Sequence, residues 1–197
     1  MKVLKDFYTR EDTLALAKEL IGMELCHAHP DGLTTGLIVE TEAYCGITDR
    51  GCHAWGDRRT ERTEVMYRQG GLAYVYLCYG IHQMFNVVTH REGFPHAILI
   101  RALEPLAGLD LMQHRRQTDN REKLCSGPGN VGKAMGFSTQ QSGLSLEGDT
   151  IWIERPSSYA TRDITESPRV GMNFDGPYKT VPWRYRLFGS RFTSRAR

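Results

Sequence analysis

Apolar residues recur at nearly helical spacing close to the N-terminus, over residues 14–21. Thr9 and Asp12 have the spacing of a capping box ahead of this run. Gly22 follows it, at the place where a left-handed glycine commonly closes a helix. The pattern therefore predicts a helix that opens at Thr9 and ends before Gly22.

Two strand-like runs come next, residues 23–29 and 33–44, and the turn-forming Pro30-Asp31-Gly32 separates them. Successive side chains of a strand point to opposite faces. In the second run this alternation predicts one face formed by Leu37, Val39, Thr41 and Ala43. It predicts the opposite face from Ile38, Glu40, Glu42 and Tyr44. We therefore expect Glu42 and Tyr44 to project together near the end of this strand.

The rest of the chain mixes strands and helices. The pattern predicts a hairpin around Gly80-Ile81-His82, with strands at residues 72–79 and 84–89, and further strands at 97–103 and 150–155. It predicts helices at residues 105–116, with Pro105 in the first turn, and at 126–135, closed by Gly136. Regular βαβ alternation is absent and no repeat or linker divides the chain, so we expect an α+β fold in one domain, residues 1–197.

Composition limits the class of protein. Of the 197 residues, 40% are hydrophobic and 24% are charged, which is typical of a soluble globular protein. No apolar run has the length of a membrane span, and none at the N-terminus resembles a signal peptide. We therefore expect a cytoplasmic or nucleoid protein, nuclear in a eukaryote, without membrane contact. The five cysteines are an odd number without a regular framework, which indicates reduced thiols.

Charge is spread unevenly, although the net charge is only +2. Three segments are rich in basic residues: residues 58–68, residues 114–116 and residues 179–197, the last without any acidic residue. Local basic patches on a nearly neutral chain are typical of a protein that binds phosphates on one face. A solvated basic tail would explain the composition equally well.

Three tyrosines of the predicted hairpin are candidates for nucleic-acid contact. Tyr74, Tyr76 and Tyr79 fall within six residues, and Tyr79 lies at the tip beside Gly80. Tyrosines also favour strands for purely structural reasons. If they are functional, the tip aromatic would enter a base stack while a neighbour lines a base pocket. Stacking is worth about 1–3 kcal/mol per base, so two or three rings could offset the cost of flipping a base.

Glu42 and Tyr44 could belong to an ordinary solvated strand edge, the default for an isolated glutamate. Three potential partners make a site more probable than that default: His53 on a charged loop, Tyr76 on the hairpin, and Arg101 at the end of an apolar run. An arginine whose head group is buried needs a partner, and a carboxylate or its bound water would serve.

Metal and phosphate motifs are weak. Cys26-His27-Ala28-His29 and Cys52-His53 lack the spacing of known zinc sites. The turn Ser126-Gly127-Pro128-Gly129 opens a predicted helix, so its backbone N–H groups could hold a phosphate, but the Lys-Ser/Thr ending of a Walker motif is missing. We expect neither a metal nor a cofactor.

Several segments, in this order, closely resemble the alkyladenine (3-methyladenine, or methylpurine) DNA glycosylase family. They are residues 38–44 (IVETEAY), His53 with Gly56 and Arg59-Thr60, residues 74–80 (YVYLCYG) with Asn86, residues 99–106 (LIRALEPL), Ser126-Gly127-Pro128 and Arg169-Val170-Gly171. The likeness runs from about Phe7 nearly to the C-terminus. No short motif is decisive alone, whereas the ordered set is highly specific.

The resemblance implies a single α+β domain with a curved antiparallel β-sheet, surrounding helices and a protruding β-hairpin. It implies that Glu42 is the general base for a water molecule and that Arg101 helps to position that water or Glu42. Two catalytic residues are thus expected on neighbouring strands.

The resemblance also implies how a flipped base is held. Tyr44 would stack on one side of the base, with His53 and Tyr76 on the other. Asn86 would lie at the floor of the pocket, where it disfavours the 2-amino group of guanine. Tyr79 would fill the gap left in the duplex, whereas Tyr74 is expected only to support the pocket.

The implied function is that of a monofunctional DNA glycosylase of base excision repair. It would act as a monomer on double-stranded DNA with damaged purines of the 3-methyladenine, 7-methylguanine, hypoxanthine and ethenoadenine class, leaving an abasic site. No lysine lies beside Glu42 in the matched motif, so no Schiff-base lyase activity is expected. Two alternatives use the same residues: a non-catalytic nucleic-acid-binding module and a small-molecule hydrolase.

Overall fold

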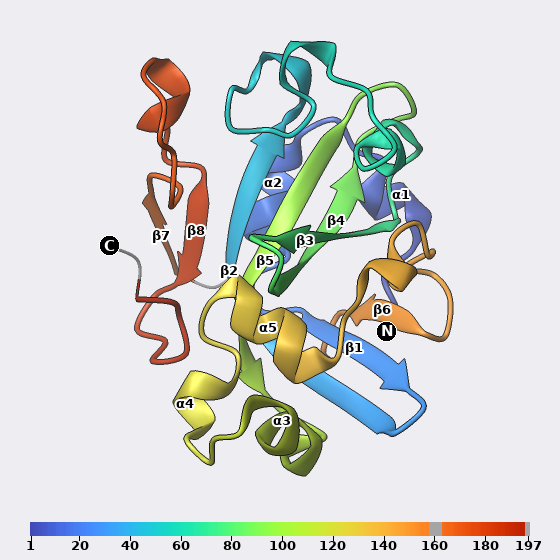
Figure 1. The fold of residues 1–197 in the computed structure, drawn as a ribbon, viewed down its shortest axis with the longest axis vertical. Helices are drawn as coiled ribbons and strands as arrows, with labels where there is room; N and C mark the ends of the chain where they lie inside the picture. The colour runs from blue at the N-terminus through green and yellow to red at the C-terminus, as the bar shows by residue number, and fades with distance from the viewer. Residues whose placement is uncertain (158–162, 196–197) are drawn as a thin grey trace.

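One curled antiparallel sheet forms the framework of the computed structural model, which describes residues 1–157 and 163–195. Its strands are β1 (Glu24–His29), β2 (Gly32–Cys45), β3 (Ala73–Cys78), β4 (His82–Thr89), β5 (His96–Pro105), β6 (Ile151–Glu154), β7 (Ile164–Ser167) and β8 (Arg184–Leu187). Their order is β3-β4-β5-β2-β1-β6, and β8 pairs with both β2 and β7. In Figure 1, β3 runs across the direction of β2, which shows how strongly the sheet curls.

Short helices cover the sheet. They are α1 (Lys5–Tyr8), α2 (Thr13–Glu19), α3 (Leu109–Arg116), α4 (Arg121–Leu124) and α5 (Pro128–Met135). Single 3-10 turns are η1 (Gly46–Thr48), η2 (Trp55–Asp57), η3 (Glu64–Tyr67), η4 (Thr139–Gln141) and η5 (Pro177–Lys179). In Figure 1, α2 lies behind the sheet and α5 in front of it. Among the residues described, no helix is long and apolar enough to cross a membrane.

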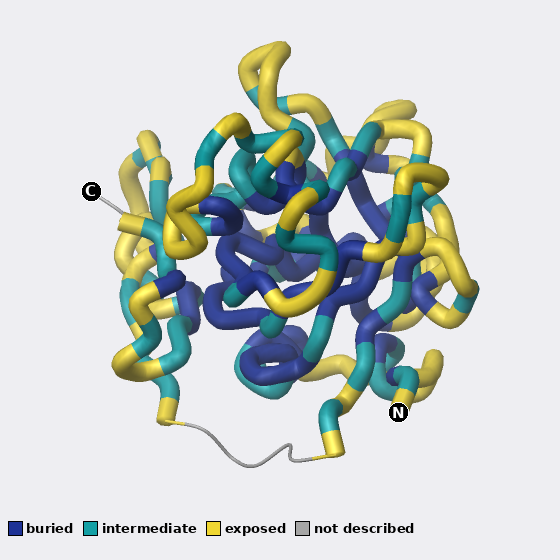
Figure 2. The backbone as a smooth tube through the Cα atoms, turned by 90° about the horizontal axis from the view of Figure 1, so that it is seen from below, coloured by how far each residue is buried: buried dark blue, intermediate teal, exposed yellow. Residues whose placement is uncertain are grey.

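The apolar positions collect between these layers. The main core contains Leu16 and Ala17 of α2, Val131 of α5, and Ile98 and Ile100 of β5, all fully buried. Figure 2 shows the buried backbone at the centre and the exposed residues on the outer loops. These features confirm the expected α+β fold with a curved antiparallel sheet.

Strand β2 contains an irregularity that the alternation did not predict. Its pairing with β5 shifts register between Ile38 and Glu40, and again between Glu40 and Thr41. Ile38 consequently packs in the main core, whereas Val39 packs in a separate cluster with Phe192. The predicted faces are therefore wrong before Glu40. A bulge of this kind inserts an extra residue and reverses the direction of the side chains that precede it.

Four predictions of local structure need correction. Asp12, not Thr9, caps the second helix, because its carboxylate accepts the backbone N–H of Ala15 at 2.9 Å. Pro105 is the last residue of β5, so α3 begins only at Leu109. The short elements α1 and α4 were not predicted. The strands β7 and β8 were also missed, although β8 proves essential to the site.

Candidate active site

A cavity of about 340 Å³ opens on the face of the sheet opposite α2. It is lined by residues of β2, β3, β4 and β5, by the start of α5, and by two loops. The lining consists of Tyr44, Gly51, His53, Met66, Tyr74, Tyr76, Cys78, Tyr79, Met84, Asn86, Ala97, Leu99, Arg101, Pro128, Val170, Gly171 and Met172. Six of the seven site residues predicted from the sequence thus line one cavity. The seventh, Glu42, lies directly behind its wall.

Aromatic rings form one side of the cavity. The rings of His53 and Tyr76 meet edge to face, with centroids 4.6 Å apart. Nδ1 of His53 shares a hydrogen bond of 2.8 Å with the hydroxyl of Tyr74. Tyr74 itself is only 1% exposed, so it fixes the imidazole from behind. This contact agrees with the supporting place that was expected for Tyr74.

Burial sets the charge state of His53. Burial, with smaller contributions from the nearby guanidinium groups of Arg62 and Arg58, lowers the pKa of this imidazole to about 4. His53 is therefore neutral near pH 7. A neutral imidazole can contribute a ring face and one hydrogen bond without repelling a cationic ligand.

Asn86 is buried on β4, opposite Tyr74 of β3. Its Nδ2 donates to the backbone carbonyls of Tyr74, at 3.1 Å, and Met84, at 3.3 Å. The hydrogen bonds hold the amide against the hairpin backbone. Asn86 therefore presents a fixed polar group to the cavity.

Glu42 is fully buried and held from three sides. Its Oε2 accepts the hydroxyl of Tyr44 at 2.8 Å and lies 3.3 Å from Nη1 of Arg101. Its Oε1 accepts the backbone N–H of Val170 at 2.8 Å. All three partners line the cavity, so the carboxylate is separated from it by a single layer of side chains.

A second buried ion pair supports Tyr44 from outside the cavity. Arg169 forms two hydrogen bonds with the carboxylate of Asp49, at 2.6 and 2.7 Å, and both side chains are completely buried. Its guanidinium carbon lies 4.7 Å from the centre of the Tyr44 ring. The Arg169-Val170-Gly171 segment is thereby anchored to the end of β2, which fixes the N–H of Val170 against Glu42.

Tyr79 occupies the tip of the β3–β4 hairpin. It is 90% exposed, and Ile81 beside it is 72% exposed. The backbone of Tyr79 is left-handed, with φ of 51°, and Gly80 follows with φ of 74°. Two consecutive positive φ values are typical of the type I′ turn, a position where asparagine or glycine is preferred. Packing does not explain a bulky aromatic at this position, because the side chain of Tyr79 is almost fully exposed.

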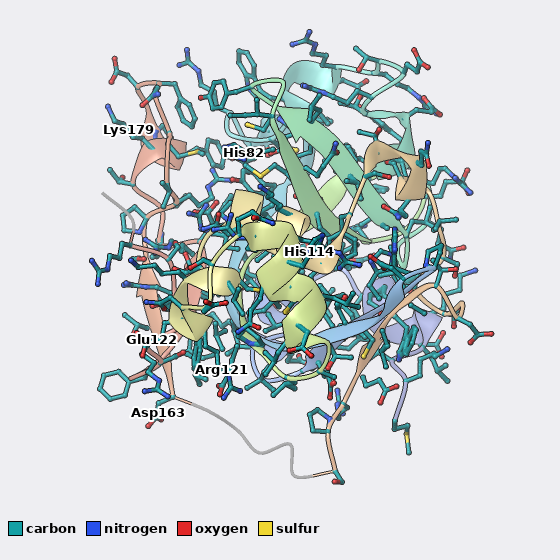
Figure 3. The ribbon with its side chains drawn as sticks, turned by 60° about the horizontal axis from the view of Figure 1, so that its bottom comes forward. His82, His114, Arg121, Glu122, Asp163 and Lys179 are labelled. Carbon is teal, nitrogen blue, oxygen red and sulfur yellow. The ribbon has the colours of Figure 1, made fainter. Side chains whose placement is uncertain are left out.

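The basic segments are less available than their sequence suggested. Arg184 is buried, and Arg59, Arg115 and Arg191 form ion pairs with Glu64, Asp31 and Glu122. Figure 3 shows Lys179 and His114 well apart, on different segments. Several basic residues of the three segments are therefore buried or already paired with a carboxylate. Arg58 and Arg62 remain exposed near the cavity, and the described residues provide no acidic partner for either.

The sequence did not point to several residues that shape the site. Glu40, Arg184 and Ser194 surround Arg101, and Asp49 holds Arg169. Among the described residues no group of three or more metal-ligating side chains is assembled. The available signal for Glu40 was a second glutamate two residues before Glu42. The available signal for Arg169 was its place in a short motif.

These features define a class of enzyme. A cavity walled by aromatic rings, with a buried carboxylate behind it and a tyrosine at the tip of an adjacent hairpin, fits a DNA glycosylase, which hydrolyses the N-glycosidic bond of a base.

Comparison with known proteins identifies the family. The model of the methylpurine-DNA glycosylase family matches residues 6–191, and the chain belongs to this family. Proteins of Chlamydia felis, Chlamydia abortus and Clostridium acetobutylicum, each named "Putative 3-methyladenine DNA glycosylase", are 43%, 44% and 40% identical to it. The alignments cover 93%, 93% and 98% of this chain and 94%, 96% and 98% of these relatives. The protein is therefore a DNA glycosylase that removes alkylated bases in DNA repair.

Proposed function

We propose that this enzyme flips single damaged purines out of duplex DNA into the cavity and hydrolyses their glycosidic bonds with a water activated by Glu42. The position of Glu42 carries the proposal. It lies behind the cavity wall with Tyr44, Arg101 and Val170 as its three partners, and all three also line the cavity. A base in the cavity would therefore bring its glycosidic bond close to this carboxylate.

The cavity suits one base. Its volume of about 340 Å³ lies at the low end of small-molecule sites. Tyr44 on β2 and the pair His53–Tyr76 offer aromatic rings for stacking, worth about 1–3 kcal/mol per base. Tyr79 would enter the duplex from its exposed turn and replace the lost stacking. Together these contacts offset the few kcal/mol that flipping requires.

Glu42 retains the capacity to hold water. The N–H of Val170 is the one donor to Oε1 among the described residues, and a carboxylate oxygen can accept two hydrogen bonds. In the proposed reaction water donates one proton toward Glu42 while its oxygen attacks the sugar carbon. The bond to the base breaks, and its electron pair leaves with the base. General base catalysis of this kind supplies about 10²–10⁴-fold.

Purines with a positive charge are the simplest substrates. A base such as 3-methyladenine or 7-methylguanine accepts the electron pair without prior protonation, so one carboxylate is sufficient. We also propose hypoxanthine and 1,N6-ethenoadenine, because neither carries the 2-amino group that Asn86 would disfavour; 7-methylguanine carries this group but departs readily as a cationic base. No lysine occurs in the cavity lining described, so the proposal includes hydrolysis without lyase activity, by a monomer.

The test is base release from duplex oligonucleotides that carry one 7-methylguanine, hypoxanthine or 1,N6-ethenoadenine. We expect release by the wild type and none by Glu42→Gln, which should still bind the same duplexes. Glu61→Gln, an exposed neighbour on the loop, serves as the control and should behave like the wild type. Full activity of Glu42→Gln would overturn the mechanism. Borohydride trapping of a covalent enzyme–DNA adduct would overturn the hydrolytic course.

A further inference from the structure

Glu40 is a fully buried carboxylate that the reaction described above does not use. Its Oε1 accepts hydrogen bonds from Nε of Arg101, at 2.8 Å, and from Nε of Arg184, at 2.7 Å. Ser194 adds two more donors, its hydroxyl to Oε1 at 2.8 Å and its backbone N–H to Oε2 at 2.6 Å. Such complete satisfaction is typical of a group that fixes the geometry of its neighbours.

The two glutamates share one arginine unequally. Nε of Arg101 lies 2.8 Å from Glu40, whereas Nη1 lies 3.3 Å from Glu42. A guanidinium that faces a single carboxylate tends to form a bidentate pair with two short bonds. Glu40 occupies the Nε edge of Arg101 and so prevents the guanidinium from closing onto Glu42. Glu42 thereby receives only one long contact from Arg101, at 3.3 Å.

The charge balance supports this arrangement. Burial alone would raise the pKa of Glu40, but Arg101, the N–H of Ser194 and Arg184 together hold the pKa below its usual range. Glu40 is therefore ionised at neutral pH. Two buried arginines, Arg101 and Arg184, then face two buried carboxylates, Glu40 and Glu42. If Glu40 were neutral, two buried guanidinium groups would be balanced only by the carboxylate of Glu42.

We infer that Glu40 is a positioning residue for base excision, which holds Arg101 at the cavity wall and keeps Glu42 free to engage water. The inference rests on the proposed function of Glu42. It also assigns a purpose to the C-terminal segment, because Ser194 contacts both Glu40 and Nη2 of Arg101. A purely structural ion cluster would stabilise the fold without affecting the chemical step.

The first experiment compares Glu40→Gln with the wild type and with Glu122→Gln, an exposed glutamate on α4 that Figure 3 labels. Single-turnover base release and the Kd for lesion duplex are measured separately, well below the melting temperature of each variant. We expect Glu40→Gln to lose about 100-fold in rate, as a misplaced catalytic group does, with Kd within about threefold of the wild type. Glu122→Gln should match the wild type in both.

Glu40→Gln presents an amide to four donors and could fail to fold, so Ser194→Ala is the second variant. It removes the hydroxyl contact but keeps the backbone N–H. We expect about a fivefold or greater loss of rate at unchanged Kd. Wild-type rates in Ser194→Ala, or in a folded Glu40→Gln, would overturn the inference. If Glu42→Gln releases base normally, the proposed function itself fails, and the two failures are thereby distinguished.

Discussion

The hydroxyl of Tyr44 donates a hydrogen bond to Oε2 of Glu42 at 2.8 Å. One side chain therefore both walls the cavity and orients the carboxylate behind it. Burial, and then the charge of Glu42, raises the pKa of Tyr44 far above its usual value, so the hydroxyl remains a donor at any working pH. In the proposed mechanism, recognition of the base and placement of the carboxylate are coupled through this bond.

Tyr44→Phe should separate the two tasks. The ring that would stack on the base is retained, whereas the donor to Glu42 is lost. A hydrogen bond to a charged group is worth about 1.5–3 kcal/mol, so we expect the single-turnover rate to fall about 10- to 100-fold. The Kd for lesion duplex should stay close to that of the wild type, because stacking is unchanged.

The control for this variant is Tyr178→Phe, which removes a tyrosine hydroxyl outside the cavity lining. It should leave both the rate and the Kd unaltered. The coupling between Tyr44 and Glu42 would be refuted by a Tyr44→Phe enzyme that releases base at the wild-type rate. It would also be refuted by a variant that loses binding and rate in the same proportion.

The alternation of side chains predicted the positions of Glu42 and Tyr44 for a reason that is visible in the structure. The bulge in β2 lies before Glu40, so the alternation is intact from Glu40 onward and fails only for Leu37, Ile38 and Val39. Nothing in the sequence of these apolar residues marks the extra residue. Longer elements with strong patterns were therefore predicted, whereas a local register shift was not.

The strands β7 and β8 were missed because they have only four residues each, although Tyr185 and Leu187 alternate with arginines in β8. They exist through their pairing with each other and with the long strand β2. The same pairing changes the role of Arg184. In the sequence it belongs to a basic run, but β8 turns it onto the buried carboxylate of Glu40. Long-range pairing of this kind cannot be inferred from local spacing.

Two partly buried histidines should make the protein sensitive to mild acid. Burial lowers the pKa of His96 to about 4, with a smaller contribution from His90, and the pKa of His53 is similarly low. The unfolded chain takes up these protons near pH 6.5, but the folded protein does so only near pH 4. Between these values the unfolded state binds more protons, so the free energy of unfolding falls as the pH is lowered, by at most about 3 kcal/mol per histidine.

Urea unfolding from pH 8 to pH 4 measures this effect. We expect a constant free energy above about pH 6.5 and a decline below it. His96→Gln should decline less steeply, since one of the two linked protons is gone. His114→Gln, at an exposed position of α3, should follow the wild type. Equal slopes for His96→Gln and the wild type would show that His96 does not contribute.

The β3–β4 hairpin, which carries Tyr79 at its tip, approaches α5 closely at Gly129 and Gly132. A matched pair of variants can measure how far this contact holds the hairpin in place. A Cβ at Gly132 would lie 1.9 Å from the backbone oxygen of Gln83, whereas one at Gly129 would meet only the movable ring of His82 at 2.7 Å. Gly132→Ala must therefore displace β4, at a cost of about 1–3 kcal/mol in the free energy of unfolding. Gly129→Ala should leave the free energy of unfolding nearly unchanged. Alanine favours a helix over glycine by about 1 kcal/mol, and this gain offsets the cost of moving the His82 ring.

In Gly132→Ala and Gly129→Ala, the free energy of unfolding and the rate of base release should change together. Displacement of β4 moves Asn86 and the tip at Tyr79, so Gly132→Ala is expected to lose both stability and single-turnover rate. Gly129→Ala should keep both. Identical behaviour of the two variants would mean that the close approach of α5 to Gln83 does not hold the hairpin in place.

Arg58 should contribute to DNA affinity through charge alone. It is exposed, it lies close enough to His53 to affect the pKa of that imidazole, and the part of the chain that the structure describes contains no acidic partner for it. A guanidinium that neutralises one phosphate changes the slope of log Kobs against log salt by about 0.9. We therefore expect Arg58→Gln to make that slope shallower by about this amount, for damaged and undamaged duplexes alike.

Arg10→Gln, whose arginine is already paired with Glu19, is the control and should leave the slope unchanged. An unchanged slope in Arg58→Gln would place the DNA backbone elsewhere, because a cation that contacts phosphate cannot be removed without releasing fewer counterions.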